Sequence, residues 1–164
     1  MRLELVCGKR AYGCLNQAWE QNLQVSRSLS VKPIGTYDAV HKMGEELIAL
    51  RERLAALENA SFAHRAEELR GRGDVLLIED GLLSPDAVRR FTSAVGETCG
   101  GRGAVFAGAD GEYRYAVSLK GGNLRDFTQK MNAALHGRGG GKPDFVQGSV
   151  AATRREIEHF FESL

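Results

Sequence analysis

The residues with the clearest chemical potential lie in one short segment, residues 136–149, which reads HGRGGGKPDFVQGS. Glycine has no Cβ atom, so a run of glycines can turn several backbone N–H groups toward one point and let an anion approach closely. The segment closes with Gln147 at the start of an expected final helix, and we expect the Gln147 side chain to belong to the same site. We therefore predict a phosphate-binding loop made of Gly137, Arg138, Gly139, Gly140, Gly141 and Lys142.

Two familiar nucleotide-binding motifs do not fit this segment. A Walker phosphate loop needs a glycine, four residues, and then Gly-Lys followed by Ser or Thr. Here His136 stands at the first glycine and Pro143 at the hydroxyl position. The dinucleotide pattern GxGxxG, started at Gly137, places Lys142 at its last glycine. A crowded turn without a ligand is the alternative explanation, because glycine runs commonly mark turns.

Positive charge is concentrated around the glycine run. The whole chain has a net charge of +1, but residues 114–155 contain eight Lys or Arg and only two acidic residues. Such a surplus is expected where a protein binds a phosphate backbone, although a solvated face would also carry it. Besides the two cations of the loop, we expect three from this stretch to contact phosphate, namely Lys120, Arg125 and Lys130.

Composition excludes several classes of protein. The chain has 164 residues, of which 43% are hydrophobic, and this suits one domain with an appendage. No apolar run approaches the roughly 18 residues of a membrane span, and no signal peptide is evident, so we expect a cytoplasmic protein. The three cysteines and four histidines form neither a disulfide framework nor a metal-ligand pattern. No catalytic constellation was found, and we expect no enzymatic activity, metal site or cofactor in this chain.

The first 70 residues are expected to form a strand and two helices. Residues 2–7 alternate charged and apolar side chains, as a half-buried strand does. Apolar residues then recur every three or four positions at 11–30 and at 36–70, which predicts two amphipathic helices. We predict that these pack as an antiparallel hairpin, and a homodimer is the alternative. Either would use a heptad seam made of Met43, Leu47, Leu50, Leu54 and Leu57.

Glycine becomes frequent after residue 70, and we place a domain boundary there. Strands are predicted at 75–79, 104–107 and 112–119, with a short extended piece at 144–146. Helices are predicted after an N-cap at Ser84, after a cap at Asn123, and at 149–164. One face of the strand at 112–119 is expected to be buried and the other free. The fold class is thus α/β, with an N-terminal helical hairpin followed by a two-layer domain that contains a small mixed sheet and the glycine-rich loop.

Two segments resemble a known family. Residues 142–148, KPDFVQG, match position by position the signature of the DHH-associated domain, which ends alanyl-tRNA synthetases and the longer alanyl-tRNA editing proteins of the AlaX type. Arg138 interrupts the usual glycine run, and Ser149 replaces a further glycine. Residues 2–11 resemble the last strand of the AlaX editing domain. The resemblance implies a piece of a larger protein, with a residual editing-domain strand at 1–10, a helical arm at 11–70 and the DHH-associated domain at 71–164.

The resemblance also implies a function. The chain would be a non-catalytic region that binds tRNA, in particular alanine-accepting tRNA. Its parent would be an aminoacyl-tRNA deacylase or an alanine–tRNA ligase, in which a zinc-dependent upstream domain hydrolyses wrongly attached serine or glycine. Two alternatives remain: a homodimerisation module, and the phosphate-gripping domain of a DHH phosphoesterase.

Overall fold

The computed structural model describes residues 7–81 and 83–163 and divides the chain into two compact units, with the division between Arg53 and Leu54. The predicted strand at 2–7 lies outside the described residues except for Cys7, which precedes the first helix. That helix already begins at Gly8, so residues 8–10 are helical and do not continue a strand.

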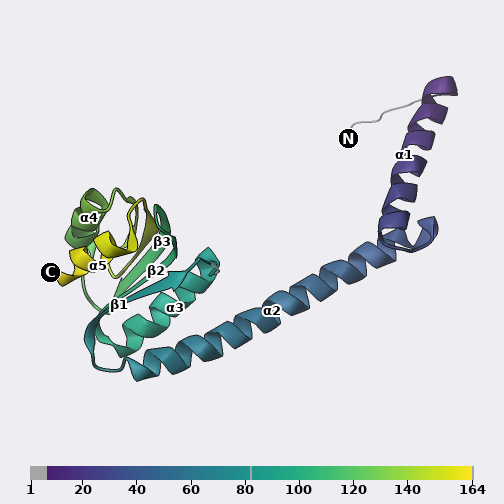
Figure 1. The fold of residues 1–164 in the computed structure, drawn as a ribbon. Coiled ribbons are helices and arrows are strands. Elements are labelled where there is room, and N and C mark those ends of the chain that lie inside the picture. Colours follow the sequence, from purple (N-terminus) through teal and green to yellow (C-terminus); the bar gives the residue numbers. More distant parts are fainter. Residues whose placement is uncertain (1–6, 82, 164) are drawn as a thin grey trace. The chain divides into compact units, whose positions relative to one another are not determined.

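The first unit contains two helices in the predicted order. They are α1 (Gly8–Ser28) and the N-terminal part of α2 (Thr36–Glu68), joined through the short 3-10 helix η1 (Pro33–Gly35) (Figure 1). The connection is fixed by the Asn22 side chain, which donates a hydrogen bond to the Pro33 carbonyl (2.8 Å) and accepts one from the Thr36 hydroxyl (2.7 Å).

The predicted packing of the seam in an antiparallel hairpin is not observed. The seam residues remain exposed, with exposed fractions between 48% and 63%. On α1, the apolar side chains Leu15 and Trp19 are exposed as well. The seam residues lie on one helix, α2, and α1 does not cover those that belong to this unit.

The second unit is built on a five-stranded mixed sheet in the order β1-β2-β3-β5-β4. β1 and β2 are parallel, and every other neighbouring pair is antiparallel. The predicted mixed sheet is therefore confirmed. The strands are β1 (Gly73–Asp80), β2 (Gly100–Ala109), β3 (Glu112–Leu119), β4 (Arg138–Lys142) and β5 (Phe145–Val150).

Helices cover both faces of this sheet, so the domain has three layers and not the two predicted (Figure 1). One face packs against α3 (Pro85–Thr98) and the end of α2, and the other packs against α4 (Arg125–Ala134) and α5 (Arg154–Glu162). The expectation of one free face on β3 is wrong for the same reason. Ala116 is fully buried on the α3 side, whereas Tyr115 and Val117 are buried on the other side.

The end of α2 belongs to the sheet domain. The Phe62 ring stacks on Phe91 of α3 with 4.5 Å between ring centroids, and the Arg90 guanidinium lies 2.6 Å from the Glu58 carboxylate. The compact unit therefore begins within α2 and not at the predicted boundary after residue 70.

Side-chain caps fix the starts of α3 and α5. The Ser84 hydroxyl accepts a hydrogen bond from the Ala87 N–H, as predicted. The predicted cap at Asn123 is not the N-cap of α4, which is Leu124, although the Asn123 side chain accepts a hydrogen bond from the Arg125 N–H. The start of the last helix was predicted wrongly. Ser149 lies within β5, and α5 is instead capped by Thr153, whose side chain and backbone exchange hydrogen bonds with Glu156.

Candidate nucleic-acid interface

The glycine run is an edge strand and not the predicted loop. Residues 138–142 form β4, which pairs only with β5 across the two-residue turn Pro143-Asp144. The turn is held to its surroundings by its own carbonyl groups. The Pro143 carbonyl accepts from the Leu124 N–H (2.6 Å), and the Asp144 carbonyl accepts from the Leu119 N–H (2.9 Å).

This geometry changes what the backbone can offer to an anion. In an antiparallel pair, successive residues turn their N–H groups alternately toward the partner and away from it, so an edge strand presents every second N–H to solvent. None of the four glycines has a positive φ, which an anion-binding nest requires. The amides therefore lie in a row along β4 and do not converge on one point as predicted.

Three of the four glycines are required by close packing. A Cβ atom at Gly139 would overlap the Gln147 carbonyl and the Tyr115 hydroxyl, and one at Gly141 would overlap the Phe145 carbonyl. At Gly137 the obstacle is the Asn132 side chain, 2.5 Å from the Cβ position. Gly140 differs from these three, because nothing lies within 4 Å of its Cβ position.

A hydrogen-bonded pair, buried Tyr115 and half-buried Asn132, lies beside Gly139. The Tyr115 hydroxyl donates a hydrogen bond to the Asn132 side-chain oxygen (2.9 Å), and the Asn132 amide donates one to the Gly139 carbonyl (3.3 Å). Burial raises the pKa of Tyr115, although the hydrogen bond with Asn132 acts in the opposite direction. Tyr115 is thus a neutral hydrogen-bond donor that ties α4 to the edge strand.

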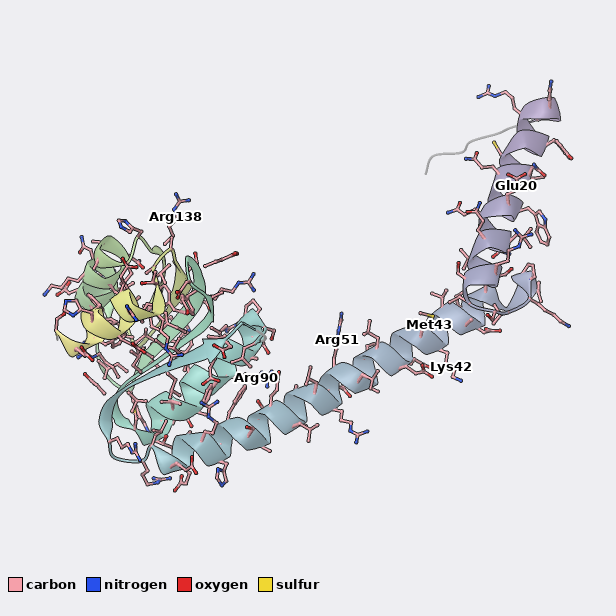
Figure 2. The ribbon with its side chains drawn as sticks, viewed as in Figure 1. Glu20, Lys42, Met43, Arg51, Arg90 and Arg138 are labelled. Atoms are coloured by element: carbon pink, nitrogen blue, oxygen red, sulfur yellow. The ribbon has the colours of Figure 1, made fainter. Side chains whose placement is uncertain are left out.

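Strand alternation sorts the predicted site residues onto two sides of the sheet. Arg138 and Ser149 are paired, and Ser149 is paired in turn with Arg114 of β3, so these three side chains share one face. The same alternation places Gly140, Gln147 and Lys142 on that face, which is the one that α3 partly covers. Figure 2 shows Arg138 projecting away from the domain into solvent.

We call this surface the basic face and define it by five residues: Arg89, Arg114, Arg138, Lys142 and Gln147. Two hollows of about 630 and 500 Å³ lie along the basic face, and Arg89 of α3 and Gln147 border both of them. All its members are exposed.

The remaining predicted cations are distributed differently. Lys120 borders a smaller hollow beside Phe145 and Asp144, next to the basic face. Arg125 lines a hollow of about 440 Å³ between α4 and the backbone of β4, which Lys142 also borders. Lys130 is exposed on α4 and borders none of these hollows. The predicted set is therefore only partly brought together.

Sequence reasoning missed Arg89. It lies on α3, far from the glycine run in sequence, and the helix pattern marks it only as a polar surface residue. Only the packing of α3 against β2 and β3 brings it to the basic face, so no signal in the sequence identified it.

Some cations of the domain form ion pairs and others do not. Ion pairs with carboxylates are formed by Arg65, Arg90, Arg102 and Arg154. The hydrogen bond that the Arg65 guanidinium donates to the Glu79 carboxylate is the largest cause that raises the pKa of Arg65. Figure 2 marks Arg90, whose guanidinium contacts Glu58 of α2 and Asp86 of α3. By contrast, none of the four cations of the basic face has an ion-pair partner among residues 7–81 and 83–163.

Two features are absent from the described part of the chain. It contains no group of three or more His, Cys, Asp or Glu side chains placed to hold a metal ion. Its helices include none that is both long and apolar enough to cross a bilayer.

The chain is similar to several known proteins. A family model described as the DHHA1 domain matches residues 73–164, more than half of the chain. The alanine–tRNA ligase of Shewanella loihica is 27% identical over 162 residues, covering 89% of this chain and 18% of the ligase, so the chain spans less than a fifth of that relative. The crystal structure of the C-Ala domain from Aquifex aeolicus alanyl-tRNA synthetase matches with a TM-score of 0.43 and 14% identity, covering 55% of this chain and 86% of that one.

Proposed function

We propose, because the chain belongs to the DHHA1 domain family through residues 73–164, that it is the tRNA-binding region of a larger protein that acts on alanine-accepting tRNA. The similarity to an alanine–tRNA ligase supports this choice of substrate. The finer part of the proposal is that the parent protein is a ligase or a deacylase whose zinc-dependent domain removes wrongly attached serine or glycine. In this proposal the chain itself contributes binding and no chemistry.

The observation that carries the proposal is the set of unpaired cations on the basic face. Four positive side chains from α3, β3 and β4 share one exposed surface and have no ion-pair partner in the described part of the chain, whereas other arginines of the domain are paired with carboxylates, namely Arg65, Arg90, Arg102 and Arg154. Unpaired exposed cations attract a polyanion and release its counterions on binding. Because the cations touch phosphates and not base edges, the binding should follow the shape of folded RNA more than its sequence.

A charge reversal at Lys142 tests this function. We expect Lys142→Glu to weaken binding of alanine-accepting tRNA by roughly tenfold and to reduce the slope of log affinity against log salt by about one unit, because one phosphate contact is lost. Filter binding across a series of salt concentrations measures both quantities.

The matched control is Arg155→Glu, which changes net charge equally on α5, on the opposite side of the sheet. An equal loss in both variants would mean that only net charge matters. Unchanged affinity and slope in Lys142→Glu would exclude the proposed role of the basic face. Tight binding of a short oligonucleotide together with indifference to tRNA would favour the phosphoesterase-like alternative.

A second candidate function is homodimerisation through α2. The exposed seam supports this candidate, since Met43, Leu47 and Leu50 repeat at heptad spacing on one uninterrupted helix. Figure 2 marks Met43 on this helix. A dimer would remove these side chains from water.

Sedimentation velocity at tens of micromolar decides this candidate. We expect the unaltered chain to sediment as a dimer and Leu47→Asp to sediment as a monomer, because a buried unpaired charge opposes association. Ala49→Asp, on the other side of the helix, serves as the control and should remain dimeric. A monomeric unaltered chain would remove the support for this candidate.

A further inference from the structure

The end of α2 borders a hollow on the basic face. Asn59 of α2 lines the hollow of about 630 Å³, together with Arg89 of α3 and Gln147 of β5. Asn59 lies before residue 73, where the match to the family model begins, so it is not part of the matched domain. A molecule that fills this hollow would therefore contact α2 as well as α3 and β5.

Arg90 fixes the orientation of the Asn59 side chain. The Arg90 guanidinium (Figure 2) donates hydrogen bonds to the Asn59 side-chain oxygen and to the Ala55 carbonyl (3.2 Å). A guanidinium can donate but cannot accept, so the amide oxygen of Asn59 faces Arg90 and the amide NH2 group faces away from it. This NH2 group has no hydrogen-bond partner in the described part of the chain, and Asn59 is exposed. Asn59 therefore has free N–H donors at the hollow.

The same arginine removes unfavourable charge from this part of the hollow. Arg90 forms ion pairs with Glu58 (2.6 Å) and with Asp86 (2.9 Å), and Asp86 borders the hollow. The other carboxylate at the hollow is that of Glu97, about two turns further along α3. Near Asn59, an anion would thus meet neutral donors and the unpaired cation Arg89.

We propose that Asn59 contacts the RNA bound at the basic face by donating hydrogen bonds to a phosphate oxygen, and that Arg90 is its positioning residue. This inference rests on the proposed function and deepens it. Amide side chains are common donors to phosphate in nucleic-acid complexes. Asn59 borders the hollow only when the end of α2 packs against α3. Because a ligand stabilises the state that it binds, bound RNA should hold α2 in this place.

Two substitutions of Asn59 test the contact. Asn59→Asp keeps an oxygen atom for Arg90 but replaces the N–H donors by a negative charge. We expect it to unfold at the same urea concentration as the unaltered chain and to bind alanine-accepting tRNA about tenfold less tightly, because a carboxylate repels phosphate. Asn59→Ala should bind about threefold less tightly with an unchanged salt slope, because it loses a neutral donor and no charge.

Ala60→Asp is the matched control for charge. Ala60 is exposed and lies two residues before the buried Phe62, so it is on the side of α2 that faces away from the core. This variant adds the same negative charge to the same helix and should bind tRNA as tightly as the unaltered chain does.

Hydrogen exchange in the full chain measures the effect on α2. We expect the backbone amides of residues 54–68 to exchange more slowly when alanine-accepting tRNA is bound, because bound RNA opposes the release of α2 from α3. Asn59→Ala, at tRNA concentrations that saturate it, should show a smaller decrease in the exchange rate.

The outcomes separate the two proposals. If the unaltered chain does not bind tRNA, the proposed function fails, and this inference fails with it. If Lys142→Glu weakens binding while Asn59→Asp and Asn59→Ala bind as tightly as the unaltered chain, only this inference is overturned. An equal loss of affinity in Asn59→Asp and Ala60→Asp would also overturn it, as would exchange at residues 54–68 that tRNA does not change.

Discussion

Arginine serves two purposes in this chain, and Arg102 and Arg138 illustrate them. Arg102 lies over the Phe127 ring at 4.8 Å from its centroid and forms an ion pair with Asp74, so its charge is used within the fold. Arg138 is exposed and forms no ion pair within the described part of the chain. The two kinds of arginine cannot be distinguished by composition, because only the fold shows which carboxylates lie nearby.

The pair formed by Asp74 and Arg102 predicts a pH dependence of stability. Burial of the Asp74 carboxyl opposes its ionisation, but hydrogen bonds from the Arg102 side chain and N–H, with the positive charge of Arg102, lower the pKa overall. A carboxyl group with a lowered pKa stabilises the folded state above its ordinary pKa of about 4, and this contribution disappears as pH falls through the lowered value.

Urea unfolding of the unaltered chain and of Asp74→Asn between pH 6 and pH 2 measures this effect. We expect the variant to be less stable at pH 6 by no more than about 1 kcal/mol, because the pair is partly exposed. The difference should shrink toward low pH. A difference that does not depend on pH would show that the charge of Asp74 contributes nothing.

At the scale of elements, helices and central strands could be predicted from the sequence, and β4 could not. The helix of residues 36–68 has a clear apolar period, and α3 has both a cap and a proline at its start. β4 contains three glycines and no apolar residue, so neither propensity nor alternation indicates a strand. It is a strand because β5 offers a partner and because the small glycines fit against Tyr115 and Asn132.

The candidate site could be predicted only where its residues are close together in the sequence. Arg138, Lys142 and Gln147 were predicted as one group and lie on one face, because they belong to one hairpin. Arg125 and Lys130 were assigned to the same group by charge alone, and α4 places them elsewhere. The number of layers was missed because Ala116 and Ser118 are small and do not reveal that a helix packs over them.

At the scale of the whole molecule, the boundary of the domain lies within a continuous helix. The family match begins at residue 73, but Phe62 and Ala66 of α2 are part of the core between α3 and the sheet. A domain defined by the family match alone would therefore expose Phe91 and leave Arg90 without Glu58.

This predicts a difference between two fragments of the chain. Fragment 54–164 should unfold cooperatively in urea, and fragment 71–164 should be less stable by at least about 2 kcal/mol, because burial of the Phe62 side chain alone is worth that much. The variant Phe62→Ala in fragment 54–164 should lose a similar amount. Equal stability of the two fragments would contradict the assignment of the end of α2 to the core.

The unpaired edge of β4 has a consequence for self-association. An exposed strand edge can pair with a strand from another molecule and begin aggregation. Proteins often prevent this pairing with short edge strands and charged side chains. β4 has only five residues, and its first and last residues are Arg138 and Lys142. In an antiparallel pairing of two copies, the positive ends would face each other and repel, so the same charges that suit a polyanion also keep the protein from adding copies of itself.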